Sequence, residues 1–420
     1  MTPLWYLTRR SIANRGLTVV LTIVAVALSV ALLLGVERLR SDAREGFAQT
    51  VSGTDLVVGA RSGAVQLLLY SVFHIGDATN NVSWASIRQI AEHPQVDWLV
   101  PLSLGDSHRG FRVVGTTAEF FERYRHGEDR ALRFADGKPF DGIFEAVIGA
   151  EVAARLGYAV GESIVVAHGA GEVSFAQHDD KPFTVVGVLA RTGTPVDRSV
   201  LVSLQGIEAI HLDWSGGARM PGLNIPAEQV RRFDLEPKAV TAALVGLKSR
   251  VAVFRVQRYI NTFPDEPLTA ALPGATLQQL WGIIAIAERA LLAVSALVVL
   301  VGLAGLVAVV TASLGERRRE LAILRSMGAG PRHVFALLAL ESLVIGLAGC
   351  VLGVLTVQLT AWLAGPWLQA QHGLLLTVRG LSASEWMLLG GVLVATLVAS
   401  LVPGVRGYRQ SLADGMTIRI

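Results

Sequence analysis

The chain is short of charged residues. Asp, Glu, Lys and Arg make up 17% of its 420 residues, whereas a soluble domain usually carries about 25%. This deficit, with a hydrophobic share of 52%, argues against a purely soluble enzyme and against a disordered chain. The net charge of +3 is too small to indicate a nucleic-acid-binding protein unless it is clustered.

Cysteine and several catalytic motifs are also scarce or missing. Cys350 is the single cysteine, so no intrachain disulfide and no CxxC metal site is possible. The sequence has no GxxxxGK[ST] loop for nucleotide phosphates and no GxSxG elbow for a nucleophilic serine. We therefore expect a non-catalytic chain that binds no cofactor itself.

The hydrophobic residues gather in long uncharged blocks. About 20 helical residues cross the hydrocarbon core of a bilayer, so these blocks predict four transmembrane helices, over residues 16–36, 285–315, 334–364 and 385–406. The first block is too long for the hydrophobic part of a cleaved signal peptide, and we expect it to be retained.

The arginines predict the orientation of these helices. They cluster in residues 1–15, 316–333 and 407–420, and basic loops usually stay in the cytoplasm. Residues 37–284 and the short loop 365–384 are then extracytoplasmic. Short strand and helix signals interleave in the large segment, for example strands at 183–189 and 242–247 and a helix at 249–260. The predicted fold is four membrane helices with a large mixed α/β domain inserted between the first two.

Residues 64–75 form an apolar run that is too short to span a membrane. One interpretation is a segment of the domain core. The other is a surface that touches the membrane edge or a hydrophobic substrate.

Seven of the nine histidines fall in the α/β segment. The weak candidates for metal ligands are His168, His178, Asp179 and Asp180. Their spacing matches no tight ligand pattern, so we predict no metal site.

Small residues recur at four-residue spacing in the last two blocks. They are Gly349 and Gly353, and Gly391 and Ala395. Such faces let membrane helices pack closely, although Gly and Ala are also simply common in membrane helices.

The segment after the second span changes abruptly to charge. It combines an apolar side with arginines and ends in a glycine turn, with the residues Glu316, Arg317, Arg318, Arg319, Glu320, Leu321, Ile323, Leu324, Arg325 and Gly328. A short amphipathic helix of this kind either lies on anionic headgroups or docks into a groove on a soluble partner. We call this segment, residues 316–333, the elbow.

The run ERRRELAILRSMGAGPRHVFALLALES resembles the signature of MacB/FtsX-type ABC transporter permeases. The segment SLVPGVRGYR near the C-terminus is similar to the segment that closes the fourth span in that family, although Gly404 and Gly407 replace alanines and the following "DP" is absent. Segments such as EAVIGAEVAARLGYAVGESIVV and FTVVGVLARTGTP resemble the periplasmic core domain of the same family.

The resemblance implies a permease subunit of the bacterial inner membrane that works with a cytoplasmic ABC ATPase dimer and a second permease copy. ATP and Mg would bind the partner ATPase, the elbow would dock into it, and its motion would pass to the outer domain by mechanotransmission. A periplasmic adaptor or substrate protein and membrane lipids are further expected partners. The alternatives are a regulator of a cell-wall hydrolase, a lipoprotein-release permease, a membrane sensor and a metal-related transporter.

Glu341 is a membrane-embedded acid near the start of the third span. It has three interpretations: a carboxylate at the headgroup level, the partner of an elbow arginine, or a proton relay.

Overall fold

The computed structural model describes residues 16–50, 52–127, 129–169, 178–215, 218–220, 225–316, 323, 326–372 and 378–409. The chain divides into two compact units. The helical unit comprises Met1–Ala43 and Ala285–Ile420, and the α/β unit comprises Arg44–Ile284.

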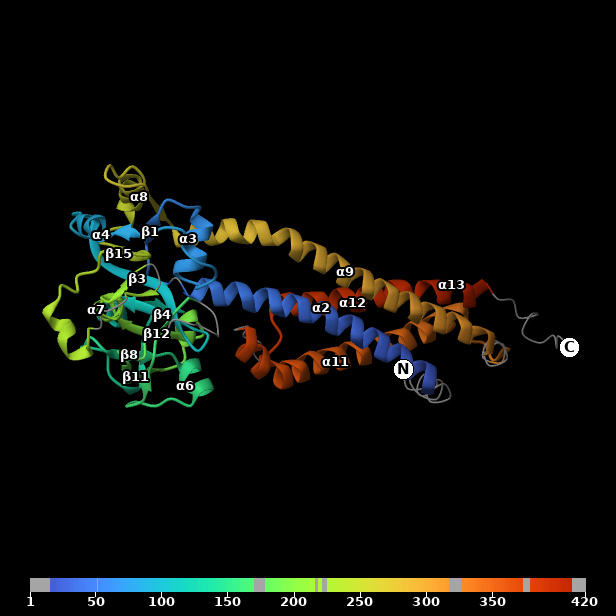
Figure 1. Ribbon diagram of the computed structural model, residues 1–420. Coiled ribbons are helices and arrows are strands. Elements are labelled where there is room, and N and C mark those ends of the chain that lie inside the picture. The colour runs from blue at the N-terminus through green and yellow to red at the C-terminus, as the bar shows by residue number, and fades with distance from the viewer. Residues whose placement is uncertain are drawn as a thin grey trace. The chain divides into compact units, whose positions relative to one another are not determined.

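Four helices of the described chain are long and apolar enough to cross a membrane (Figure 1). They are α2 (Gly16–Thr50), α9 (Pro273–Glu316), α11 (Pro331–His372) and α12 (Ala383–Ala399), and the short α13 (Leu401–Arg409) follows. Their candidate membrane spans cover Gly16–Gly46, Pro273–Leu314, Arg332–Gly365 and Ala383–Arg406. The predicted set of four membrane helices is confirmed.

The helices extend beyond the predicted spans because backbone hydrogen bonds continue past the last apolar residue. Helix α9 begins at Pro273, well before the predicted residue 285, and proline suits a first helical turn, whose N–H groups have no partner within the helix. The first boundary between the units falls after Ala43. Arg38, which pairs with Glu385, therefore lies inside the helical unit.

One apolar core holds the helical unit together. All four long helices contribute to it, with buried side chains such as Val30, Leu306, Leu338 and Val392. These residues lie on the inner faces of helices whose outer faces remain apolar and exposed, for example at Leu28 and Val351. Apolar residues on both sides are the pattern of a helix bundle that faces lipid.

The α/β unit is built on a mixed sheet of eleven strands. The main order is β17 (Leu268–Ala271), β1 (Leu56–Ala60), β16 (Ala242–Leu247), β3 (Val96–His108), β4 (Phe111–Thr116), β12 (Ser199–Ser203), β8 (Glu145–Ile148), β11 (Phe183–Leu189) and β7 (Phe134–Gly137). Strand β10 (Ala167–His168) pairs with β3, and β9 (Ser163–Ile164) pairs with β11. The long β3 therefore belongs to both halves of the sheet, with β16 along its first part and β4 and β10 along its second.

Helices and short elements cover this sheet (Figure 1). The helices are α3 (Ala64–Ser71), α4 (Trp84–Ala91), α5 (Glu119–Arg123), α6 (Ala150–Leu156), α7 (Leu204–His211) and α8 (Val253–Asn261), and the 3₁₀ turns are Pro195–Arg198, Ala227–Arg232 and Arg250–Ala252. Three two-stranded pairs complete the unit: β13 (Trp214–Ser215) with β14 (Ala218–Arg219), β15 (Ala239–Val240) with β2 (Val82–Ser83), and β5 (Arg125–His126) with β6 (Arg130–Ala131).

The structure decides between the two interpretations of residues 64–75. Residues 64–71 of the run form α3, whose Leu67, Leu68 and Tyr70 are buried in a core shared with Val57 of β1 and Ala271 of β17. Most of the run is therefore part of the domain core, and only Ile75 at its end is largely exposed among its large apolar residues.

Candidate coupling site

Most of the predicted ATPase-coupling residues lie outside the described residues. These are Arg317, Arg318, Arg319, Glu320, Leu321, Leu324 and Arg325, together with the side chain of Glu316. Of the others, Ile323 exposes 57% of its surface, and Gly328 has a left-handed φ of 94°. Glycine adopts this φ at little cost, so the glycine turn predicted at the end of the elbow is present at Gly328.

Glu341 lies on α11 and exposes only 2% of its surface, beside the fully buried Ser342. This burial places the carboxyl inside the helical unit, where a charge is costly without compensation. The headgroup-level carboxylate, the pair with an elbow arginine and the proton relay all stay predictions.

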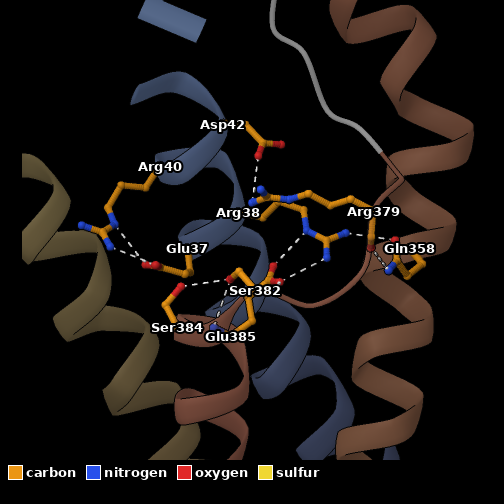
Figure 2. A network of polar contacts seen from close by, with 9 residues as sticks. All are labelled: Glu37, Arg38, Arg40, Asp42, Gln358, Arg379, Ser382, Ser384 and Glu385. Atoms are coloured by element: carbon orange, nitrogen blue, oxygen red, sulfur yellow. Dashed lines mark hydrogen bonds and ion pairs between the residues drawn. The ribbon is translucent and has the colours of Figure 1, made fainter. Parts of the chain in front are cut away.

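The helical unit contains a buried ion pair that sequence analysis missed (Figure 2). Nε of Arg38, on α2, donates to Oε1 of Glu385, on α12, at 2.9 Å. The two side chains expose 1% and 0% of their surfaces. Nη1 of Arg38 also donates to Oε1 of Gln358, on α11, at 3.0 Å. One guanidinium group thus joins three of the four long helices.

Glu385 is held in place by the start of its own helix. Its Oε2 accepts a hydrogen bond from the Ser382 backbone N–H at 2.7 Å, and its backbone N–H donates to Ser382 Oγ at 3.3 Å. This reciprocal arrangement is a capping box. The carboxylate also lies at the positive end of the α12 dipole, which stabilises its charge.

Further polar contacts extend the network to the segment before α12 (Figure 2) and to α9. Gln358 Nε2 donates to the carbonyl of Arg379 at 2.7 Å, and the Arg379 guanidinium lies 3.0 Å from Asp42. Arg40 pairs with Glu37 at 2.9 Å and lies 3.9 Å from Glu288 on α9. All four long helices are therefore linked by charge-assisted contacts, which we call the Arg38–Glu385 network.

A buried ion pair adds little net stability, because desolvating both charges offsets most of their attraction. Removing one partner is costly, since the remaining charge is buried without compensation. The network therefore favours one arrangement of the helices over alternatives that would separate Arg38 from Glu385.

One sequence signal for this network was available. Ser382 precedes Glu385 by three residues just before an apolar run, which is the pattern of a capping box. The pairing of Glu385 with Arg38 has no such signal, because the two residues lie 347 positions apart.

The small residues divide into two groups. A Cβ added at Gly349 would lie 2.5 Å from Val26 Cγ1, and one added at Gly353 would lie 2.8 Å from Val30 Cβ. Gly349 and Gly353 thus allow close approach of α11 and α2. Gly391 is exposed, and no described atom lies within 4 Å of its added Cβ. Ala395 is half-buried on α12.

We expect Gly349→Leu to destabilise the helical unit by about 1–3 kcal/mol, because the added side chain forces α2 and α11 apart. Gly391→Leu is the matched control and is expected to have little effect, since its side chain meets open space. Detergent-induced unfolding of the full-length protein measures both. Equal effects of the two substitutions would contradict this packing role.

The structure brings together two of the weak metal candidates. His168 and His178 lie with His211, and one ring nitrogen from each lies within 4.8 Å of the others. Asp180 instead pairs with Lys181 at 3.0 Å and with Arg219 at 2.6 Å. Asp179 does not belong to the histidine group found among the described residues.

Comparison with known families identifies the chain. Residues 17–262 match the MacB-like periplasmic core domain, and residues 292–412 match the FtsX-like permease C-terminal domain. The chain belongs to the MacB/FtsX-type family of ABC transporter permeases. This permease is a multi-pass membrane protein with four candidate membrane helices among its described residues.

The permease is 25% identical, over 233 residues, to an uncharacterised ABC transporter permease of Methanocaldococcus jannaschii. The match covers 54% of this chain and 51% of the relative, so the chain spans about half the length of the curated relative that it matches.

Two solved structures are also similar to the permease. The periplasmic region of MacB from Actinobacillus actinomycetemcomitans is 10% identical with a TM-score of 0.33, over 56% of this chain and 97% of that one. The extracellular domain of the noncanonical ABC-type transporter YknZ from Gram-positive bacteria is 13% identical with a TM-score of 0.29, over 52% of this chain and 98% of that one.

Proposed function

We propose that this permease couples ATP hydrolysis by a separate ATPase to conformational work of its α/β unit, for export or for handling of a lipoprotein-type substrate outside the membrane. The observation that carries the proposal is the placement of charge in the helical unit. Its fully or nearly buried Asp, Glu, Lys and Arg residues, among those described, are Glu37, Arg38, Glu341 and Glu385. They lie toward the ends of their spans, whereas a polar transport path would need ionisable groups further inside.

The middle of the helical unit is closely packed. Ser29 Oγ donates to the Ala25 carbonyl and Thr396 Oγ1 donates to the Val392 carbonyl, each at 2.8 Å. Each hydroxyl thus has an acceptor on its own helix, and Ser29 Oγ also lies 3.3 Å from the Val298 carbonyl of α9. Apolar side chains such as Val30 fill the space between helices. A packed interior supports mechanical transmission through the helices of this chain.

The connection between the units supports the same proposal. Helix α2 runs to Thr50 and α9 starts at Pro273, so each unit boundary falls inside a continuous helix. A hydrogen-bonded helix transmits a displacement along its length. The Arg38–Glu385 network joins α2 to α11 and α12, so a motion that starts at the elbow would move these helices together.

The proposal places the termini and the elbow in the cytoplasm and the α/β unit outside the inner membrane, because the arginines favour the cytoplasmic side. A cytoplasmic ATPase dimer would supply ATP and Mg, and a second permease copy would complete the complex. A periplasmic adaptor or substrate protein would then contact the α/β unit.

Disrupting the elbow tests the proposal. We expect Leu321→Asp combined with Leu324→Asp to abolish copurification of the ATPase, since charge on an apolar docking face prevents its burial in a groove. The control is Ile75→Asp combined with Phe233→Asp, two exposed apolar residues of the α/β unit, and it should retain the ATPase. An unchanged ratio of ATPase to permease in the elbow variant would overturn the docking role.

A further inference from the structure

A second polar site lies in the α/β unit, where four parts of the chain meet. Strand β10 pairs with β3 so that His168 stands opposite Asp106. His211 is the last residue of α7, and His178 lies shortly before β11. We call Asp106, His168, His178 and His211 the histidine site.

Three ligand atoms of the histidine site already have the spacing of a metal polyhedron. Asp106 Oδ1 lies 3.0 Å from His168 Nδ1 and 3.8 Å from His211 Nε2, and these two nitrogens are 3.4 Å apart. Zinc bonds to nitrogen and oxygen are about 2.0–2.2 Å long, which puts the ligand atoms of a tetrahedron about 3.4 Å apart. The three measured separations, 3.0, 3.4 and 3.8 Å, are centred on this value.

His178 provides an independent observation. The residue is 0% exposed, and neither ring nitrogen has a hydrogen-bond partner in the part of the chain that the structure describes. Its ring centroid lies 4.7 Å from that of His168 and 5.1 Å from that of His211. A buried polar group without a partner is costly, and a metal ion among these rings would remove that cost.

The protonation states also suit a metal. His211 Nδ1 lies 2.8 Å from the Ile207 carbonyl, which accepts a hydrogen bond from a protonated Nδ1 and leaves the Nε2 lone pair for a ligand bond. Burial, with the neighbouring histidines adding to it, lowers the pKa of His178 to about 3. Burial likewise lowers the pKa of His211. Neutral imidazole is the form that coordinates metals.

We propose that His168, His178 and His211 bind a divalent transition-metal ion, for which Zn²⁺ is the best match, and that Asp106, which lies beside His168 and His211, completes the ligand set. Three imidazoles and one carboxylate suit zinc, whereas Ca²⁺ and Mg²⁺ prefer oxygen ligands alone. With Asp106 as the fourth protein ligand the site is of the closed, structural type. The ion then joins β3, β10 and α7 to His178, which precedes β11.

Neighbouring groups hold the site in shape. The Trp214 ring packs against His178 with centroids 4.4 Å apart. Beyond His178, Lys181 pairs with Asp213 at 2.6 Å and both are fully buried. Because Asp180 is already paired with Lys181 and Arg219, its role is to position the turn after His178 and not to bind the ion.

The test uses the full-length permease, purified in detergent and stripped with a chelator. After dialysis against micromolar Zn²⁺, we expect about one zinc per chain by elemental analysis and a rise in melting temperature, because a ligand of the folded state stabilises it. X-ray absorption at the zinc edge should show imidazole nitrogens at about 2.0–2.1 Å. No retained zinc, or an absorption spectrum without imidazole ligands, would overturn the proposal.

Variants then locate the ion. His178→Ala and His211→Ala should each reduce bound zinc to background and remove the melting shift. His93→Ala is the control, since His93 packs on Tyr259 outside the histidine site, and it should bind like the wild type. His178→Gln, which keeps most of the side-chain volume, replaces His178→Ala if that variant does not fold. Wild-type zinc content in the His178 variant, or equal loss in the control, would contradict the assignment. The proposal is independent of ATPase coupling, because zinc content and melting temperature are measured on the permease alone.

Discussion

Arg38→Met is expected to destabilise the helical unit by about 3–5 kcal/mol, because it leaves the Glu385 carboxylate buried without its guanidinium partner. Both side chains are almost completely buried, so water does not replace the lost contact. The substitution also removes the donor to Gln358. Unfolding of the full-length protein in mixed micelles of increasing denaturing detergent measures the loss.

The double variant Arg38→Met with Glu385→Leu should recover most of this loss, since a buried ion pair replaced by apolar side chains of similar size is often neutral or stabilising. The double variant should remain about 1 kcal/mol less stable than the wild type, because Glu385→Leu also removes the side chain that caps α12. Arg289→Met, at an exposed position of α9, is the matched control and should unfold like the wild type. A double variant no more stable than Arg38→Met alone would refute the ion-pair explanation.

Lys181→Met should have a comparable effect on the α/β unit, because Asp213 would then be buried without its ammonium partner, which lies 2.6 Å away. Arg219 lies 4.0 Å from Asp213 and takes up part of the loss, so we expect the lower end of about 3–5 kcal/mol. For a domain of this size that corresponds to a melting temperature lower by roughly 6–12 °C. Lys248→Met, at an exposed position, is the control. Melting is measured with a chelator present, so that a change in melting temperature does not come from the loss of a bound metal ion.

The same variant should change the acid dependence of stability. Burial raises the pKa of Asp213, but the hydrogen bond and charge of Lys181 outweigh it and hold the pKa below its usual 3.8. A lowered carboxyl pKa contributes stability above the unfolded pKa of about 3.9, and that stability is lost as the pH falls through the folded pKa. As the pH falls below 4, Lys181→Met should therefore lose less stability than the wild type. Parallel plots of stability against pH for the two proteins would argue against an electrostatic interaction between Lys181 and Asp213.

Features that depend on neighbouring residues were predictable. Hydropathy adds up along a segment, so the four membrane helices could be located without a structure. Alternating and β-branched patterns are equally local, and strands β11 (Phe183–Leu189) and β16 (Ala242–Leu247) have the predicted bounds. The left-handed Gly328 also lies where the glycine pattern of the elbow predicted a turn.

Features that depend on which elements meet were not predictable. The contact of Arg38 with Glu385 across the bundle was missed because the two residues lie 347 positions apart. Gly349 and Gly391 look alike in sequence, but only Gly349 packs against another described helix, since the direction a residue faces within a bundle is set by the partner helices.

The sequence by itself therefore determined the membrane helices, the inserted α/β domain and the family, because hydropathy, strand periodicity and a contiguous motif are properties of short segments. Only the tertiary structure decided where buried charge is compensated and which histidines meet. The ion pair of Arg38 and Glu385 joins helices from opposite ends of the chain, and the histidine site brings together residues of β3, β10 and α7 with His178, which precedes β11. Such sites arise from the pairing of distant elements, and no spacing along the chain records that pairing.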